Sequence, residues 1–219
     1  MRFLMFLCLG FSSAAQAQQT ILITAFDPFG GASVNNSYEV ALELQNQLQN
    51  FHAEICLLPT IFDVASDEAR KCFEALPSPP VAVISLGEAD CRFRFETQGQ
   101  NLDWSTDEPD NRGETRKDHV IDPTGPEFSP TTLPLQAMFQ GLSRAQRSRI
   151  VISSSAGNFV CNNTAYHLSR YFSGLNMPYG FIHVPGHACS KRKKDPVRNA
   201  EVLARMIDLG ISGSQTNVR

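Results

Sequence analysis

The sequence has little tryptophan, little cysteine and no excess of charge of one sign: its 219 residues include 1 tryptophan and 6 cysteines, and the formal net charge is −3. The near balance of charge excludes a general electrostatic attraction to nucleic acid, which needs a basic surface. The low density of cysteine excludes a small scaffold held by disulfide bonds, since a chain of this length buries a core of its own. What remains is a hydrophobic fraction of 42%, which is typical of one globular domain.

Long apolar runs are also missing, and the longest stands near the N-terminus. Arg2 precedes an apolar run over residues 3–11, and the sequence Ala15-Gln16-Ala17 follows it. The run is shorter than the roughly 20 residues of a membrane-spanning helix, and small residues at alternate positions are typical of a signal-peptidase site. We therefore expect residues 1–17 to be a signal peptide and the mature protein to be exported, with no membrane attachment after cleavage. A tethering helix or a buried N-terminal segment is the alternative.

Short apolar runs alternate with segments of helical periodicity along the rest of the chain. The runs predict strands over residues 20–25, 53–58, 81–86, 150–154 and 179–184. Helical stripes cover residues 38–48, 69–76, 135–142 and 197–207. This alternation is typical of the α/β class, and the lack of polar residues in most runs favours parallel strands covered on both faces. We expect a single domain over residues 18–209 and a frayed tail over residues 210–219.

In an open parallel sheet the functional site lies beyond the carboxyl ends of the strands. Five segments are expected there: residues 26–31, 87–90, 93–101, 155–161 and 183–185. The polar, proline-rich and glycine-rich stretch over residues 97–130 predicts a long loop, which in a compact domain is usually functional or mobile.

Cys161 stands where a glycine-containing turn should lead into a helix. Free N–H groups and the positive end of the helix dipole favour a thiolate there, which suits a nucleophile. His183 ends a predicted strand and is a candidate general base and acid, and Glu96 is a candidate to orient its imidazole. The alternatives are an inert buried cysteine, a structural histidine and a solvated carboxylate.

Three motifs occur in order between residues 21 and 185. They are Phe26-Asp27-Pro28-Phe29-Gly30-Gly31 with Asn35 and Glu39, then Ser155-Ala156-Gly157-Asn158-Phe159-Val160-Cys161-Asn162, and then Gly180-Phe181-Ile182-His183-Val184-Pro185. Together they resemble the opening, nucleophile and histidine motifs of the pyroglutamyl peptidase I family of cysteine peptidases. The resemblance implies a three-layer α/β/α sandwich around a mostly parallel sheet, and peptide substrates with an N-terminal pyroglutamyl residue.

The same resemblance implies roles for individual residues. Cys161 is then the nucleophile, His183 its base and Glu96 the third catalytic residue, while Phe26 and Phe29 sandwich the lactam of the substrate. Asn35 orders the pocket loop or bonds to the lactam ring. No metal and no organic cofactor is implied.

Glu96 matches the glutamate of the family only across a small gap. An ungapped count from Gly87 gives Gln98, whose amide is also able to orient an imidazole. We prefer Glu96, since a carboxylate also stabilises the imidazolium.

The chain departs from the family in three respects: the expected signal peptide, since the family is associated with the cytosol, and two places in the sequence. Glu88 stands where the family usually has glutamine, beside the substrate pocket, so the substrate preference depends on where its side chain points. His187, Cys189 and the basic run over residues 191–194 have no counterpart that we know. The alternatives these residues raise are a metal cluster of His183, His187 and Cys189, and a nucleic-acid footprint, although the basic run lacks interleaved aromatic residues.

These departures leave two further functions open. One is an exported protein that binds a pyroglutamyl ligand without catalysis, and the other is a thiol amidase with a different substrate. The oligomeric state is also left open. A glycan on the sequon Asn162-Asn163-Thr164 would block Cys161, which favours a bacterial protein, periplasmic or secreted.

Cleavage after residue 17 would leave five cysteines, so at least one thiol stays unpaired within a chain. We expect that thiol to be Cys161, because the mechanism needs it. Cys56 and Cys72 are one candidate pair, on a strand and the helix after it, and Cys91 and Cys189 are another, since both flank the expected site. The sequence does not fix these pairings.

Overall fold

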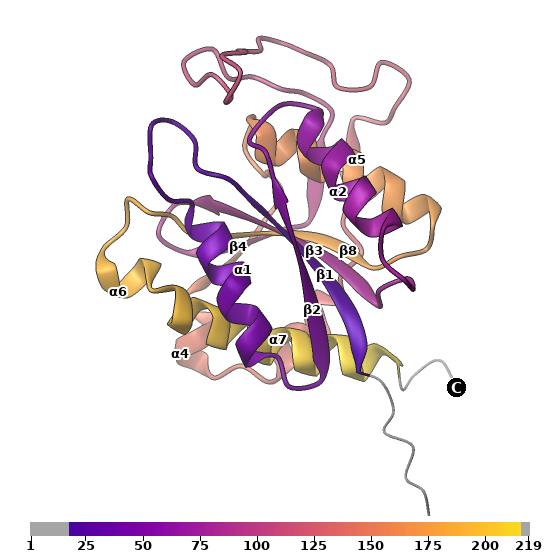
Figure 1. The fold of residues 1–219 in the computed structure, drawn as a ribbon, viewed down its shortest axis with the longest axis vertical. Coiled ribbons are helices and arrows are strands. Elements are labelled where there is room, and N and C mark those ends of the chain that lie inside the picture. Colours follow the sequence, from indigo (N-terminus) through magenta and orange to yellow (C-terminus); the bar gives the residue numbers. More distant parts are fainter. Residues whose placement is uncertain (1–17, 216–219) are drawn as a thin grey trace, which may run out of the picture.

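The structure is a computed structural model, and it describes residues 18–215. Its strands are β1 (Gln19–Phe26), β2 (Phe51–Leu58), β3 (Ala82–Ala89), β4 (Phe93–Glu96), β5 (Gln98–Gln100), β6 (Phe128–Pro130), β7 (Ile150–Ser153) and β8 (Tyr179–Pro185). Its helices are α1 (Asn36–Gln47), α2 (Val64–Glu74), α3 (Leu135–Gln140), α4 (Arg144–Arg147), α5 (Val160–Gly174), α6 (Lys191–Lys194) and α7 (Pro196–Gln215). Figure 1 shows a central sheet with helices on both faces, which confirms the predicted α/β/α sandwich.

The central sheet has six strands in the order β2-β1-β3-β8-β4-β7. β2, β1, β3 and β8 are mutually parallel, so the prediction of a mostly parallel sheet is confirmed. β4 pairs antiparallel with β8 and parallel with β7, so β4 and the edge strand β7 run in the opposite direction. β7, which matches the strand predicted over residues 150–154, runs opposite to the four parallel strands, because the chain reverses after β3 and β7 pairs with the reversed strand β4.

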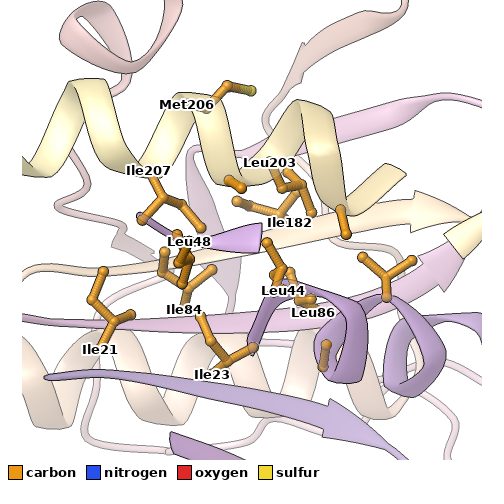
Figure 2. Packing of buried hydrophobic residues seen from close by; sticks show 14 of the residues in the cluster. Ile21, Ile23, Leu44, Leu48, Ile84, Leu86, Ile182, Leu203, Met206 and Ile207 are labelled. Carbon is orange, nitrogen blue, oxygen red and sulfur yellow. The ribbon is translucent and has the colours of Figure 1, made fainter. Parts of the chain in front are cut away.

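Side chains of each central strand alternate between two hydrophobic layers. Ile21 and Ile23 of β1 belong to the hydrophobic layer between the sheet and α1 and α7, which also contains Leu44 and Leu203 (Figure 2). Leu22 of the same strand faces the opposite layer, under α2 and α5. Burying one such aliphatic side chain contributes about 1.5–3 kcal/mol, so both layers hold the sheet in place.

Aromatic contacts and a disulfide bond fix α2 and α5 on their face of the sheet. Phe172 of α5 stacks on Tyr179 at the start of β8, with ring centroids 5.4 Å apart. Cys56 of β2 is bonded to Cys72 of α2, which confirms the first candidate pair. α5 therefore runs across the sheet from its first turn to the beginning of β8.

The C-terminal helix is longer than the sequence pattern predicts. α7 continues past Leu209 to Gln215, and Ile211 is only 2% exposed. The tail predicted over residues 210–219 therefore begins inside this helix, and Ile211 packs into the layer of α1 and α3. Residues 216–219 and the predicted signal peptide, residues 1–17, lie outside the described residues.

The long polar stretch contains little regular structure, as predicted. β5 and β6 form a two-stranded antiparallel sheet at its ends, and between them the chain extends along the top of the view in Figure 1. Within residues 18–215, none of the helices combines the length and the apolar character that crossing a bilayer requires.

Candidate active site

The first turn of α5 approaches the sheet above the end of β3. Gly87 of β3 pairs in register with His183 of β8. A Cβ atom at Gly87 would lie 2.9 Å from the Phe181 ring and 3.0 Å from Cys161 Sγ, so only glycine leaves room for both neighbours. The strand end is thus shaped to bring the thiol close to the backbone beside His183.

His183 and Glu96 form a buried pair. His183 Nδ1 lies 2.9 Å from Glu96 Oε1, and the side chains are 6% and 0% exposed. Arg94 Nε lies 3.6 Å from the same oxygen and supplies a positive charge. Because Nδ1 faces the carboxylate, the other ring nitrogen, Nε2, is left to exchange a proton with a reacting group.

The ungapped alternative to Glu96 makes a different contact. The Gln98 side chain donates from Nε2 to the carbonyl of Ser154, 3.1 Å away. It is therefore Glu96 and not Gln98 that the structure brings to His183.

Cys161 is the second residue of α5, close to where the sequence places it, and it is the free cysteine of the described chain. Phe159, the N-cap residue of α5, makes no capping hydrogen bond with its side chain. The backbone N–H groups of the first turn are therefore available to an anion. Burial raises the pKa of the Cys161 thiol above its ordinary value. The charges of three carboxylates, those of Glu88, Glu96 and Glu108, raise it further.

The raised pKa of Cys161 differs from the expectation of a thiolate at this position. The helix terminus does face the sulfur, but burial and the surrounding negative charge favour the neutral thiol. A nucleophilic role for Cys161 would therefore require a base that accepts its proton, and His183 lines the same cavity.

The two residues line a cavity of about 320 Å³. Its wall is made by Phe29, Glu88, Ala89, Glu108, Ala156, Phe159, Cys161, His183, Gly186, His187 and Ala188. The wall combines apolar residues, among them Phe29, Ala156 and Phe159, with the ionisable side chains of Glu88, Glu108, His183 and His187. A larger hollow of about 590 Å³ lies against α1 and α7, but no cysteine, histidine or serine is among its described lining residues.

The two phenylalanines of the opening motif occupy different environments. Phe29 lines the cavity and packs against Phe159, with ring centroids 5.8 Å apart. Phe26 is 2% exposed, packs against Phe181 and is not among the lining residues. The structure therefore brings Phe29 and Phe159 to the cavity wall and leaves Phe26 beneath it, which does not match the expected sandwich of Phe26 and Phe29.

Asn35 shapes the loop that carries Phe29. Its side chain donates to the carbonyl of Asp27 at 2.9 Å and accepts from the backbone N–H of Ser37 at 3.0 Å, which caps α1. Asn111 in the long loop donates to Asp27 and to the carbonyl of Pro28 at 3.0 and 2.9 Å. Of the two roles expected for Asn35, the structure displays the ordering of the loop.

Glu88 points into a polar contact with the other departing segment. Its carboxylate accepts from the backbone N–H of Asn36 at 2.7 Å and from that of His187 at 3.2 Å, and it contacts His187 Nδ1. The side chain is 4% exposed. In the sequence Glu88 and His187 are two separate departures from the family pattern, and the fold brings them into contact.

Cys91 is bonded to Cys189, which confirms the second candidate pair. A metal cluster that includes Cys189 is therefore not supported. Across residues 18–215, no three His, Cys, Asp or Glu side chains are placed to share a metal ion.

The residues after the nucleophile anchor α5, a role that the sequence did not reveal. Asn162 donates to the carbonyls of Gln100 and Leu102 at 2.9 Å, and Asn163 donates to the carboxylates of Asp63 and Asp103 at 2.9 and 2.8 Å. Both side chains are fully buried. The adjacent asparagines after Cys161 were the available signal, since buried amides must find partners.

An arginine continues this network into the long loop. Arg116, 8% exposed, bonds to Asp103 at 2.9 Å and to Asp63 at 2.6 Å. Burial raises the pKa of Asp103, while its hydrogen bonds to Asn163 and Arg116 act in the opposite direction. The loop is thereby fixed against the turn that holds Cys161.

The chain matches a family model described as pyroglutamyl peptidase over residues 19–210. It is 36% identical over 169 residues to pyrrolidone-carboxylate peptidase 1 of Caldanaerobacter subterraneus subsp. tengcongensis, covering 75% of this chain and 81% of that protein. It is 31% identical over 198 residues to the pyrrolidone-carboxylate peptidase of Staphylococcus haemolyticus, covering 87% of this chain and 91% of that one.

Solved structures share the fold. Pyroglutamyl peptidase I of Bacillus amyloliquefaciens superposes with a TM-score of 0.76 at 24% identity, over 89% of this chain and 98% of that one. Pyrrolidone carboxyl peptidase of Thermococcus litoralis gives a TM-score of 0.76 at 23% identity, over 91% and 96%. At these identities the likeness shows the architecture alone.

Proposed function

Because this chain belongs to the pyroglutamyl peptidase family, with a match over residues 19–210, we propose that it is a cysteine exopeptidase that removes pyroglutamyl residues from the N-termini of peptides. The observation that carries the proposal is the joint placement of Cys161 and the His183–Glu96 pair at one cavity. That arrangement has the nucleophile, the base and the orienting carboxylate that acyl transfer requires.

The reaction begins at a neutral thiol. As Cys161 Sγ attacks the pyroglutamyl carbonyl, its proton passes to His183 Nε2, while Glu96 accepts from Nδ1 and stabilises the imidazolium. Backbone N–H groups in the first turn of α5 stabilise the oxyanion. His183 then protonates the leaving amine, and water, activated by the same imidazole, releases pyroglutamate from the sulfur.

The cavity favours an uncharged ring over a charged residue. Phe29, Phe159 and Ala156 give it an apolar wall, on which the lactam can lie without losing hydration of a charge. A free glutamyl residue would bring its side-chain carboxylate into the same space as the carboxylates of Glu88 and Glu108, which repel it. The preference for the lactam follows from this difference.

The test is hydrolysis of a pyroglutamyl-coumarin amide, compared with glutamyl and prolyl analogues. We expect release of the fluorophore from the pyroglutamyl substrate and none above background in Cys161→Ala. Saturable binding of the substrate by both proteins without product would instead indicate a binding protein on this scaffold, and turnover of a different amide would indicate another thiol amidase.

We further propose that the protein is exported, with residues 1–17 removed as a signal peptide and a periplasmic or secreted location. The two disulfide bonds, Cys56–Cys72 and Cys91–Cys189, support this, because such bonds persist in oxidising compartments. Expression of the full chain in bacteria, fractionation and mass measurement test it. A periplasmic or secreted product that begins at Gln18 is expected, and a cytosolic product that retains Met1 would contradict it.

A further inference from the structure

The two segments that depart from the family pattern lie against each other at the cavity wall. Glu88 is the last residue but one of β3. His187 stands two residues after the end of β8, 99 positions later in the chain. The Glu88 carboxylate accepts from His187 twice, through the backbone N–H and through the ring, and from Asn36 N once. Both Glu88 and His187 are lining residues of the cavity that holds Cys161.

The segment that carries His187 is fixed by two further bonds. Cys189 is bonded to Cys91, which stands three residues after Glu88. Lys194 Nζ donates to the carbonyl of His187 at 2.6 Å. A covalent link, an amine and a carboxylate therefore hold one short segment, so its position is set by specific contacts rather than by apolar packing.

The Glu88 carboxylate lies at the wall of the cavity that holds Cys161. Its side chain is 4% exposed, and its charge disfavours ionisation of Cys161. Among the described residues, the other ionisable groups near the sulfur are Glu108, His183, the buried Tyr179 and, behind His183, Glu96, whose carboxylate Arg94 contacts. His187 is the residue whose ring meets the Glu88 charge directly.

We propose that His187 is a positioning residue of this active site, which acts through Glu88 by holding its carboxylate in the cavity wall and compensating its charge beside Cys161. The inference rests on the proposed peptidase function, since it concerns formation of the nucleophile. The Cys91–Cys189 bond contributes to this positioning, because it fixes the segment from which His187 reaches Glu88.

Removal of the His187 ring leaves the Glu88 carboxylate with its backbone donors but without its ring partner. The uncompensated charge then opposes the thiolate, so we expect ionisation of Cys161 to require a higher pH in His187→Ala. Glu88→Gln in the same chain removes the charge and should reverse the effect. A role confined to packing predicts no such reversal.

Alkylation of Cys161 by iodoacetamide, followed over pH 6–10, measures this without a substrate, because the other described cysteines are in disulfide bonds. We expect the rate at pH 7 to fall about tenfold in His187→Ala, the equivalent of a shift of about one pH unit. The double variant His187→Ala/Glu88→Gln should return most of the way to the original profile. Hydrolysis of the pyroglutamyl-coumarin amide should lose kcat about tenfold, with KM changed less.

The matched control is His52→Ala. His52 also contacts a glutamate, Glu54 at 3.1 Å, but both side chains are about half exposed on β2, and we expect the alkylation profile and kcat to stay unchanged. An unshifted profile in His187→Ala, or a double variant that stays as slow as the single one, would overturn the inference. If the profile shifts while the original protein hydrolyses no pyroglutamyl substrate, the proposed function fails and the Glu88–His187 coupling stands.

A second experiment compares removal of the Cys91–Cys189 disulfide bond with removal of the Cys56–Cys72 disulfide bond. Cys91→Ser/Cys189→Ser should slow alkylation in the same direction as His187→Ala, whereas Cys56→Ser/Cys72→Ser, away from the cavity, should leave the rate of the folded protein as it was. Equal alkylation rates in the two double variants would show that the Cys91–Cys189 bond does not contribute to the positioning of His187.

Discussion

His183 Nδ1 lies 2.9 Å from Glu96 Oε1, although 87 positions separate the two residues in the chain. The antiparallel pairing of β4 with β8 makes the contact, since it sets Arg94 beside His183 and Glu96 beside Phe181. The orientation of the imidazole thus depends on β4, the strand at which the sheet reverses direction.

Glu96→Gln should lower kcat by about 10²-fold, less than the complete loss expected for His183→Ala. The amide can still accept from Nδ1, but it does not stabilise the imidazolium and can present its NH₂ group to the ring instead. Steady-state hydrolysis of the coumarin substrate measures both. Gln98→Ala is the control, since Gln98 bonds to Ser154 and should leave kcat unchanged; the opposite pattern would contradict the assignment of Glu96.

Gly87→Ala should reduce kcat by about 10- to 10²-fold, because a displacement of the nucleophile by a fraction of an ångström is costly. The added Cβ would lie 2.9 Å from the Phe181 ring and 3.0 Å from Cys161 Sγ, so one of them has to move. Gly174→Ala, at the end of α5, the helix that carries Cys161, has no atom within 4 Å of the added carbon and should keep full activity. Equal kcat in the two variants would show that the close approach at Gly87 is not required.

The sequence predicted the site residues whose signals are local. Cys161 at a helix start and His183 at a strand end are each defined by a few neighbouring residues, and both are where the pattern places them. The direction of β7 was not predictable in this way, because a four-residue apolar run carries no information about its polarity in a sheet.

Electrostatic features were predicted less well than positions. The helix terminus at Cys161 is visible in the sequence, but the burial and the carboxylates that raise the pKa of its thiol come from distant segments. The same holds for the contact between Glu88 and His187, which needs two separate loops to meet. Composition and periodicity give no information on such encounters.

Asp63→Asn should lower stability near neutral pH, and the difference from the original protein should shrink as the pH falls below about 4. Contacts with His167, then Arg116 and Asn163, hold the pKa of Asp63 below its ordinary value. A lowered pKa in the folded state stabilises the protein above the pKa of the unfolded chain and ceases to do so as acid protonates the folded carboxyl. Asparagine also tolerates the positive φ of 61° at this position.

Urea unfolding at a series of pH values measures this dependence. The exposed Asp107 provides the control, since Asp107→Asn should follow the original protein at every pH. A stability difference for Asp63→Asn that is the same at pH 3 and pH 7 would contradict the ionic origin of the effect.

Ile211→Ala should lower the free energy of unfolding by about 2–5 kcal/mol, the usual cost of truncating a buried isoleucine. Ile211 is 2% exposed and belongs to the core layer of α1, α3 and α7, beyond the point where the helical stripe in the sequence ends. Val197→Ala, on the same helix but 51% exposed, should change stability by about 0.5 kcal/mol or less. Denaturant unfolding compares the two, and an effect at Ile211 no larger than at Val197 would mean that the last turns of α7 do not contribute to the core.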